Sequence, residues 1–274
     1  MSVTITAADI NKLRQTTGAG MLDCRKALTE SNGDFEAAID WLRKQGQKVA
    51  AKRSDREAKE GVVIAQTTTD NKSGIVLCIS CETDFVSKNA DFVAFAQSIA
   101  DAAVANNVKT AEELNTVSVK GSTVAELIND KLAAIGEKIA VSKFERIDAP
   151  YVASYIHGAN RMGVLVAMTK EAAEAGKDVA MQIAAMNPLA VDETSISPET
   201  IAREKEIAIE QIKAEGKPAE MAEKIAMGKV NKFFKENTLL AQAFVKDNSK
   251  SVADYLKGVD ADLKVTDFKR VALG

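Results

Sequence analysis

Histidine is almost absent from this sequence, in which His157 is the only one among 274 residues. A single histidine excludes metal sites built from several histidines, and any catalytic triad would depend on this one residue. Because His157 ends an apolar run next to a turn, we interpret it as a structural or interface residue, with a catalytic base as the alternative. No G-x-S-x-G motif, the mark of a hydrolase nucleophile, occurs.

Cysteine is also scarce, and the odd number of three does not predict a disulfide framework. Cys78 and Cys81 form the one C-x-x-C pair. Residues three apart in a strand point to opposite faces, so these two thiolates would not easily share one ion. We predict buried, inert cysteines. The alternatives are a redox pair and a zinc site completed by Cys24 and His157.

The chain lacks a strong net charge, since 36 Lys and Arg against 39 Asp and Glu give −3. No overall positive field would therefore hold a nucleic-acid backbone. Basic residues do gather between Arg43 and Lys59, where Asp55, Glu57 and Glu60 dilute them. We interpret this stretch as a solvated, charged linker helix. A partner-docking strip and an RNA contact are the alternatives.

Long apolar runs and targeting signals are missing as well. The longest apolar runs, such as residues 163–168, are too short to span a bilayer. The first 15 residues include Asp9 and have no basic segment followed by an apolar core, so we predict neither a signal nor a transit peptide and expect a cytosolic protein. Residues 18–20 lack the spacing of a phosphate loop, so no nucleotide site and no cofactor are expected.

The first 46 residues predict a small module of three helices. Apolar residues recur at helical spacing over 7–16, 21–31 and from 35 onward. Glycine-containing segments separate the helices, and Asp34 is placed to cap the third one. Such a module would use its residual apolar surface to dock. Residues 47–60 are predicted to be a helical or mixed linker.

After residue 61 the pattern changes to that of an α+β core with antiparallel sheets. Residues 62–67 and 73–80 read as a β-hairpin, which an amphipathic helix with Phe92 and Ile99 follows. The same order returns in residues 151–157 and 162–169 and the helix after them. We therefore predict two related β-hairpin–helix subdomains, which we assign to residues 61–136 and to residues 137–196 with 238–274.

Residues 197–237 predict a helical hairpin inserted into the second subdomain. Ser197 and Pro198 suit a helix start, and residues 216–218 contain a sharp stop. Each helix carries one apolar stripe, and two helices alone cannot bury both stripes. The hairpin, a coiled coil, should therefore lean on the body or on a partner. Residues 263–273 are predicted to be an edge strand that rejoins the second sheet.

The pair Asp84–Phe85 stands where the strand 73–80 ends. In one interpretation Phe85 fills the core while Asp84 caps the following helix. In the other, the pair is a wedge in which an aromatic anchor and a carboxylate enter a partner. A carboxylate arriving at a phosphate-and-magnesium site would repel the phosphates or compete for the ion.

Four segments, in this order, are similar to the elongation factor Ts family. They are LRQTTGAGMLDCRKALTESNGD at 13–34, CETDFVSKN at 81–89, SYIHGANRMGVLV at 154–166 and NTLLAQAFVKD at 237–247. The resemblance implies an N-terminal module like a ubiquitin-associated domain, two α+β subdomains and an inserted helical hairpin. That agrees with the organisation read from the residues.

The resemblance further implies a guanine-nucleotide exchange factor for elongation factor Tu, without catalytic chemistry of its own. It implies no direct binding of nucleotide, nucleic acid or membrane, and it is compatible with a homodimer through the hairpin or the core. The residues that would disturb the partner's magnesium site are Thr83, Asp84, Phe85 and Val86. Further contacts, more distantly matched, would be Arg14, Met21, Leu22 and His157.

Overall fold

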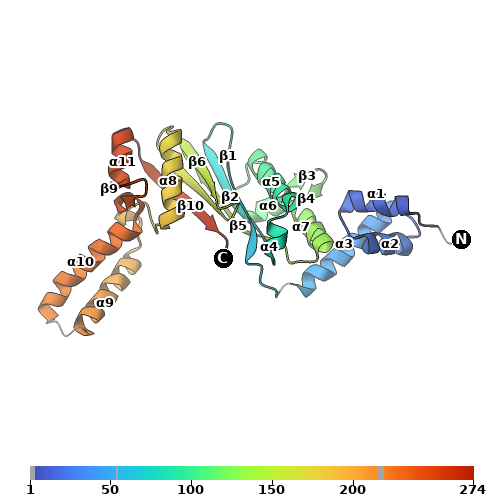
Figure 1. The fold of residues 1–274 in the computed structure, drawn as a ribbon, viewed down its shortest axis with the longest axis horizontal. Helices are drawn as coiled ribbons and strands as arrows, with labels where there is room; N and C mark the ends of the chain where they lie inside the picture. The colour runs from blue at the N-terminus through green and yellow to red at the C-terminus, as the bar shows by residue number, and fades with distance from the viewer. Residues whose placement is uncertain (1–3, 54, 215–218) are drawn as a thin grey trace.

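The computed structural model describes residues 4–53, 55–214 and 219–274, and in it the chain forms an elongated molecule (Figure 1). The N-terminal helices lie at one end, two β-sheets with their helices form the middle, and a pair of long helices projects from the other end. The α+β class and this order of parts are as predicted.

The N-terminal module consists of α1 (Ala7–Thr17), α2 (Met21–Glu30) and the first part of α3 (Phe35–Lys52). Asp34 caps α3 as predicted, since its Oδ1 accepts the N–H of Ala37 at 2.9 Å. α3 extends beyond residue 46, because its second half packs on α7 (Val124–Ile135). A Cβ at Gly46 would lie 2.9 Å from that of Ala133, so the close approach of the two helices depends on glycine. The helices share a small apolar core made of Leu13, Cys24, Ala27, Leu28, Ala38 and Leu42.

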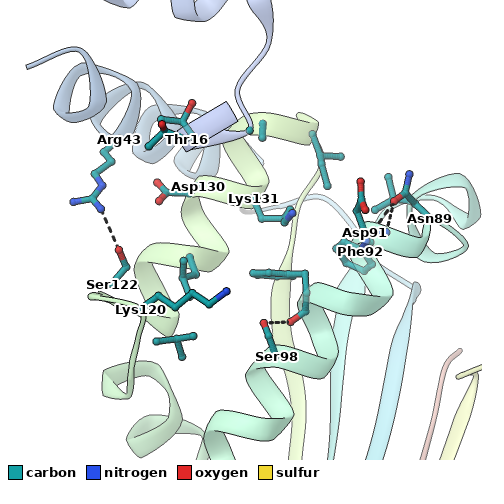
Figure 2. A pocket seen from close by; sticks show the side chains of 18 of the residues that line it. Thr16, Arg43, Asn89, Asp91, Phe92, Ser98, Lys120, Ser122, Asp130 and Lys131 are labelled. Carbon is teal, nitrogen blue, oxygen red and sulfur yellow. Dashed lines mark hydrogen bonds between the residues drawn. The ribbon is translucent and has the colours of Figure 1, made fainter. Parts of the chain in front are cut away.

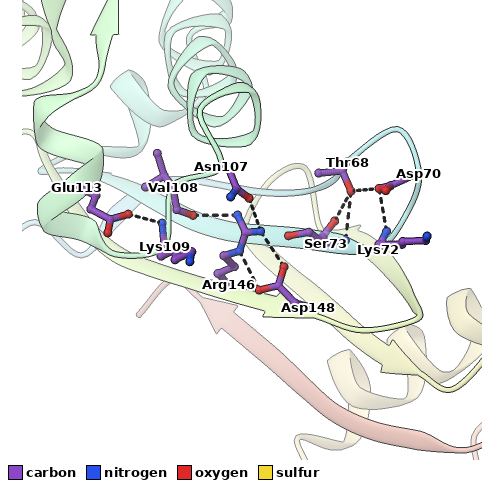
Figure 3. Close-up of polar contacts among 10 residues, drawn as sticks. All are labelled: Thr68, Asp70, Lys72, Ser73, Asn107, Val108, Lys109, Glu113, Arg146 and Asp148. Carbon is purple, nitrogen blue, oxygen red and sulfur yellow. Dashed lines mark hydrogen bonds and ion pairs between the residues drawn. The ribbon is translucent and has the colours of Figure 1, made fainter.

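The first sheet has the antiparallel order β1-β2-β5, with β1 spanning Glu60–Thr67, β2 Ser73–Cys81 and β5 Ala140–Asp148. The predicted hairpin of β1 and β2 is confirmed. The position of β5 differs from the predicted division of the chain, which assigned residues 137–148 to the second subdomain. Its pairing with β2 and a clamp by Arg146 hold it in the first (Figure 3). The Arg146 guanidinium donates to Val108 O at 3.1 Å and to Asn107 Oδ1 at 2.6 Å.

Several helices follow β2 and complete the first subdomain. After the single turn α4 (Asp84–Ser87) come α5 (Ala90–Ala105), α6 (Ala111–Thr116), the short strands β3 (Ser118–Val119) and β4 (Ser122–Thr123), and α7. Apolar side chains of α5, α6 and α7 pack with one face of the sheet, and buried Phe92, Ile99, Leu114, Ile128 and Leu132 are among them.

The second sheet has the antiparallel order β10-β7-β6, with β6 spanning Tyr151–His157, β7 Met162–Met168 and β10 Val265–Ala272. The tail of the chain is therefore the edge strand that was predicted. Helix α8 (Ala173–Met186) packs on β6 and β7. The hairpin-then-helix order thus occurs in both subdomains.

The two sheets also pack against each other through a common core. Val63, Ala65 and Val76 of the first sheet meet Val152, Leu165 and Ala167 of the second. The approach is close at Gly163, where a Cβ would lie 2.8 Å from Val76 Cγ2. Each subdomain thus has a core of its own and shares this third cluster with the other, and β2 is buried along its whole length.

The inserted hairpin consists of α9 (Pro198–Ala214) and α10 (Ala219–Asn237). The short helix η1 (Glu193–Ser195) precedes it. Ala208, Ile212 and Ala226 form its buried seam. The predicted stop at 216–218 and the side chain of Met221 lie outside the described residues. The base of the hairpin is closed by backbone bonds from Leu189 N to Asn237 O and from Leu239 N to Ala190 O.

Beyond the hairpin, η2 (Leu239–Ala241), β8 (Ala243–Phe244), β9 (Asp247–Ser251) and α11 (Val252–Val259) lead back to β10. Leu239, Phe244 and Leu256 join the core beneath α8. Among the described helices, none combines the length and the apolar character needed to cross a membrane.

Candidate functional site

Phe85 lies on the surface with 85% of its area exposed, on the turn α4 that directly follows β2. The interpretation in which it fills the core is wrong. Phe92, which is only 2% exposed, occupies the core instead. Asp84 does not cap the following helix either, because Asn89 Oδ1 accepts the N–H of Asp91 at 2.8 Å. Exposing a phenylalanine forgoes about 1.5–3 kcal/mol of burial free energy, so the packing of this chain alone does not explain its position.

Asp84 lies beside Phe85, and its carboxylate is paired rather than free. Lys88 Nζ donates to Asp84 Oδ2 at 2.6 Å, one helical turn along the chain. This hydrogen bond and the lysine charge lower the pKa of Asp84 from its ordinary value. The turn therefore presents an aromatic ring next to an ion pair.

The flanking residues of the motif hold the turn to the body. Val86 is half-buried and packs against the core of the first subdomain. Thr83 donates its hydroxyl to Glu137 Oε1 at 2.6 Å. Of the four residues 83–86, Phe85 alone is in the exposed class.

The three predicted contact residues of the N-terminal module lie at the junction of α1 and α2. Arg14 is exposed in the last turn of α1. Met21 and Leu22 begin α2 and are 50% and 81% exposed. Gly18 ends α1 in the left-handed conformation, with φ at 70°, and so allows the tight turn that brings these side chains to one end of the module.

A groove of about 870 Å³ separates that module from the Phe85 turn. One wall is the α1–α2 turn with Thr16 and Gly18, another is α4 and α5 with Phe85, and the third is formed by α7 together with residues of α3 and of the β3–β4 hairpin (Figure 2). Arg43 crosses to Ser122 Oγ at 3.2 Å, and burial raises the pKa of Asp130 in the same groove. Sequence analysis did not find this groove, since no motif connects its three walls.

His157 is exposed at the end of β6, where its Nδ1 lies 3.0 Å from Tyr155 Oη. It does not line the groove. The turn after it contacts the first sheet, since Arg161 pairs with Glu60 at 3.1 Å. Glu60 is opposite Cys81, the last residue of β2 before the Phe85 turn, so both segments lie at the same end of that sheet.

The cysteines are buried, as predicted, and Cys78 and Cys81 lie in different cores. Cys78 packs between the two sheets, whereas Cys81 packs under α5. Burial raises the pKa of both thiols, for Cys81 to about 12 with nearby Glu137 adding to the effect. Neither has the lowered pKa of a reactive cysteine. Within the described part of the chain, no group of three candidate ligands is arranged for a metal ion.

Part of the basic stretch from Arg43 to Lys59 is engaged with carboxylates. Arg53 pairs with Glu82 at 2.7 Å and Lys59 with Glu57 at 2.7 Å. Such pairing fits the interpretation as a charged linker better than a free cationic strip.

The chain is similar to known proteins over nearly its whole length. The family model described as Elongation factor TS matches residues 82–274. Elongation factor Ts of Christiangramia forsetii is 50% identical over 273 residues, covering 98% of this chain and 99% of that protein. The homologue of Flavobacterium psychrophilum is 51% identical, with 99% of both chains covered. The Clostridium perfringens protein is 44% identical, with 98% and 93% covered. The chain therefore belongs to the elongation factor Ts family of translation elongation factors.

Proposed function

We propose that this chain binds elongation factor Tu carrying GDP and promotes release of the GDP, so that GTP can take its place. The observation that carries the proposal is the exposure of Phe85 on a turn held to the body by its neighbours. The ring would enter the partner near its magnesium and phosphate site. The chain would act in the cytoplasm as an exchange factor and would need no cofactor and no catalytic group.

A few side chains could supply the free energy that this weakening of GDP binding requires. Since a factor that favours the nucleotide-free partner must bind less tightly when GDP is present, the two affinities are linked. A thousandfold weakening of GDP binding needs about 4 kcal/mol of differential contact. Burial of Phe85 in the partner would supply about 1.5–3 kcal/mol of that amount.

Because Asp84 is paired with Lys88, Phe85 would contribute more to GDP release than Asp84 would. A paired carboxylate repels a phosphate less than a free one does, because the lysine charge offsets it at short range. Asp84 would act fully on the phosphate or the magnesium ion only after the pair opens. Phe85 needs no such step.

The other contacts would hold the partner in place. Arg14, Met21 and Leu22 would bind its nucleotide-binding domain, and His157 would touch a second domain. The exposed side chains of Ile207 and Met227 on the hairpin support a further contact there, with the partner or with a second copy of this chain.

The test is GDP release from elongation factor Tu, followed by stopped flow with a fluorescent GDP analogue. We expect the purified chain to accelerate release and to co-elute with elongation factor Tu until excess GDP separates the two. Release at the spontaneous rate at every concentration of the chain would contradict the proposal.

A further inference from the structure

Glu137 reaches the Phe85 turn from 54 residues away in the sequence. It follows Gly136, which ends α7 in the left-handed conformation with φ at 79°. Its Oε2 accepts the N–H groups of Glu82 and Thr83, both at 3.0 Å. Its Oε1 accepts the hydroxyl of Thr83 at 2.6 Å. One half-buried carboxylate therefore receives three hydrogen bonds from the two residues that precede α4.

The contact is reciprocal. The carboxylate of Glu82 accepts the N–H of Lys138 at 2.6 Å and an N–H of Arg53 at 2.7 Å. The bond from Lys138 is the main reason that the pKa of Glu82 is lowered. Residues 82–83 and 137–138 are thus cross-linked by charge-assisted hydrogen bonds, which are stronger than neutral ones.

The hydrogen bonds of Thr83 differ from those of an ordinary N-cap residue. It is the N-cap residue of α4, where a threonine side chain usually accepts a backbone N–H of the helix. Here it makes no capping bond, and its hydroxyl is donated to Glu137 instead. On the other side, the thiol of Cys81 donates to the Thr83 carbonyl at 3.2 Å.

α4 cannot fix its own orientation. It has only four residues, and so short a helix has no stability by itself in water. Its direction must come from the residues that anchor its start. Of those anchors, Glu137 supplies the largest number of bonds from outside the segment.

We propose that Glu137 is a positioning residue for Phe85, which orients the α4 turn so that the ring points toward the partner. The inference rests on the proposed role of Phe85 in GDP release. Glu137 itself would touch neither the nucleotide nor the magnesium ion.

The test compares three variants. Glu137→Ala removes all three bonds, and we expect the maximal rate of GDP release from elongation factor Tu to fall at least about tenfold, the size of one lost charge-assisted bond. Glu137→Gln keeps an oxygen for the two N–H groups and should restore the rate to within about threefold of the unmodified chain. The control is Glu126→Ala, because Glu126 likewise accepts an N–H and a hydroxyl from Thr123 in the same subdomain but does not contact the turn. It should leave the rate unchanged.

A second readout needs no partner. In the free protein, the amide protons of Glu82 and Thr83 should exchange with solvent at least about tenfold faster in Glu137→Ala than in the unmodified chain. Should Glu137→Ala fail to fold, Thr83→Val removes the hydroxyl bond alone and is compared with Thr83→Ser in both measurements.

The two proposals fail differently. If elongation factor Tu releases GDP as fast with Phe85→Ala as with the unmodified chain, the proposed role of Phe85 is wrong. Hydrogen exchange alone then decides whether Glu137 orders the turn. If Phe85→Ala is slow but Glu137→Ala is as fast as the control, positioning by Glu137 is overturned. Unchanged protection of Glu82 and Thr83 in Glu137→Ala overturns it as well.

Discussion

Lys88 neutralises Asp84 at a distance of 2.6 Å, next to the exposed ring of Phe85. The two charged side chains are separated by one turn of helix and are both accessible to water. An acidic residue that is expected to disturb a magnesium site is therefore held by a lysine in the free protein. The net charge that the turn presents to a partner therefore depends on whether this ion pair is closed or open.

Lys88→Met should free this carboxylate. We expect the pKa of Asp84 to rise toward its ordinary 3.8, since the hydrogen bond from Lys88 is the main cause of its lowering. An NMR titration of the carboxyl group measures this shift. GDP release should become faster by about two- to fivefold, the size of an exposed ion pair's effect, and less so at high salt. Lys88→Arg is the control, and slower release by Lys88→Met would show instead that the lysine itself contacts the partner.

Gly163→Ala tests the packing of one sheet on the other. The added methyl would lie 2.8 Å from Val76 Cγ2 and 3.0 Å from Val63 Cγ1, so the valine side chains or one of the sheets must shift. We expect a loss of about 1–3 kcal/mol in the free energy of unfolding, measured with urea. Gly228→Ala is the control in the exposed part of α10, where a Cβ meets nothing within 4 Å. It should stabilise the protein by about 0.5–1 kcal/mol. A fully stable Gly163→Ala would show that the interface is looser than described.

Tyr255→Phe tests the attachment of α11 to α8. Tyr255 donates its hydroxyl to buried Asp178 at 2.8 Å, and Lys246 pairs with the same carboxylate at 2.6 Å. Removing the hydroxyl keeps the stacking on Phe244 and should cost about 1–3 kcal/mol in the free energy of unfolding.

The matched control for this prediction is Tyr155→Phe. Its hydroxyl bonds to the exposed ring of His157, so the loss should stay within about 0.5 kcal/mol. Equal effects of the two substitutions on urea unfolding would contradict the special role of the Asp178 contact.

The thiol of Cys81 predicts a dependence of stability on alkaline pH. Burial raises its pKa from 9.0 to about 12, so the folded state holds the proton more tightly than the unfolded state does. The stability that results is complete below about pH 9 and is lost as the pH rises toward 12. Cys81→Ala should reduce this loss of stability in unfolding measurements between pH 8 and 11.

In the native protein near pH 8, a thiol reagent such as DTNB should label none of the three buried cysteines, and rapid labelling would support the redox interpretation instead.

Much of the fold could be predicted because its signals are local. The two hairpins, the helices 7–17 and 21–30, and the cap at Asp34 follow from periodicity and turn residues a few positions apart. β5 was missed because most of its side chains are exposed or half-buried, so its sequence shows no apolar run. Its pairing with β2 and the clamp by Arg146 are long-range contacts.

The site could be predicted only in part, for the same reason. At the end of a strand, an Asp-Phe pair fits both a core plug and an outward wedge, and the local sequence does not separate them. What separates them is packing: Phe92 already fills the core, and Glu137 anchors the turn from 54 residues away. The groove beside Phe85 depends on the contact of α3 with α7, and no sequence motif indicates that contact.

The most direct test of the central claim is the effect of Phe85→Ala on GDP release from elongation factor Tu, measured by stopped flow with a fluorescent GDP analogue. Loss of the wedge should lower the maximal release rate by at least about tenfold, while the affinity for nucleotide-free partner changes by less than about threefold. Leu22→Ala should do the reverse and weaken binding with little change in the maximal rate. An unchanged maximal rate for Phe85→Ala would contradict the account.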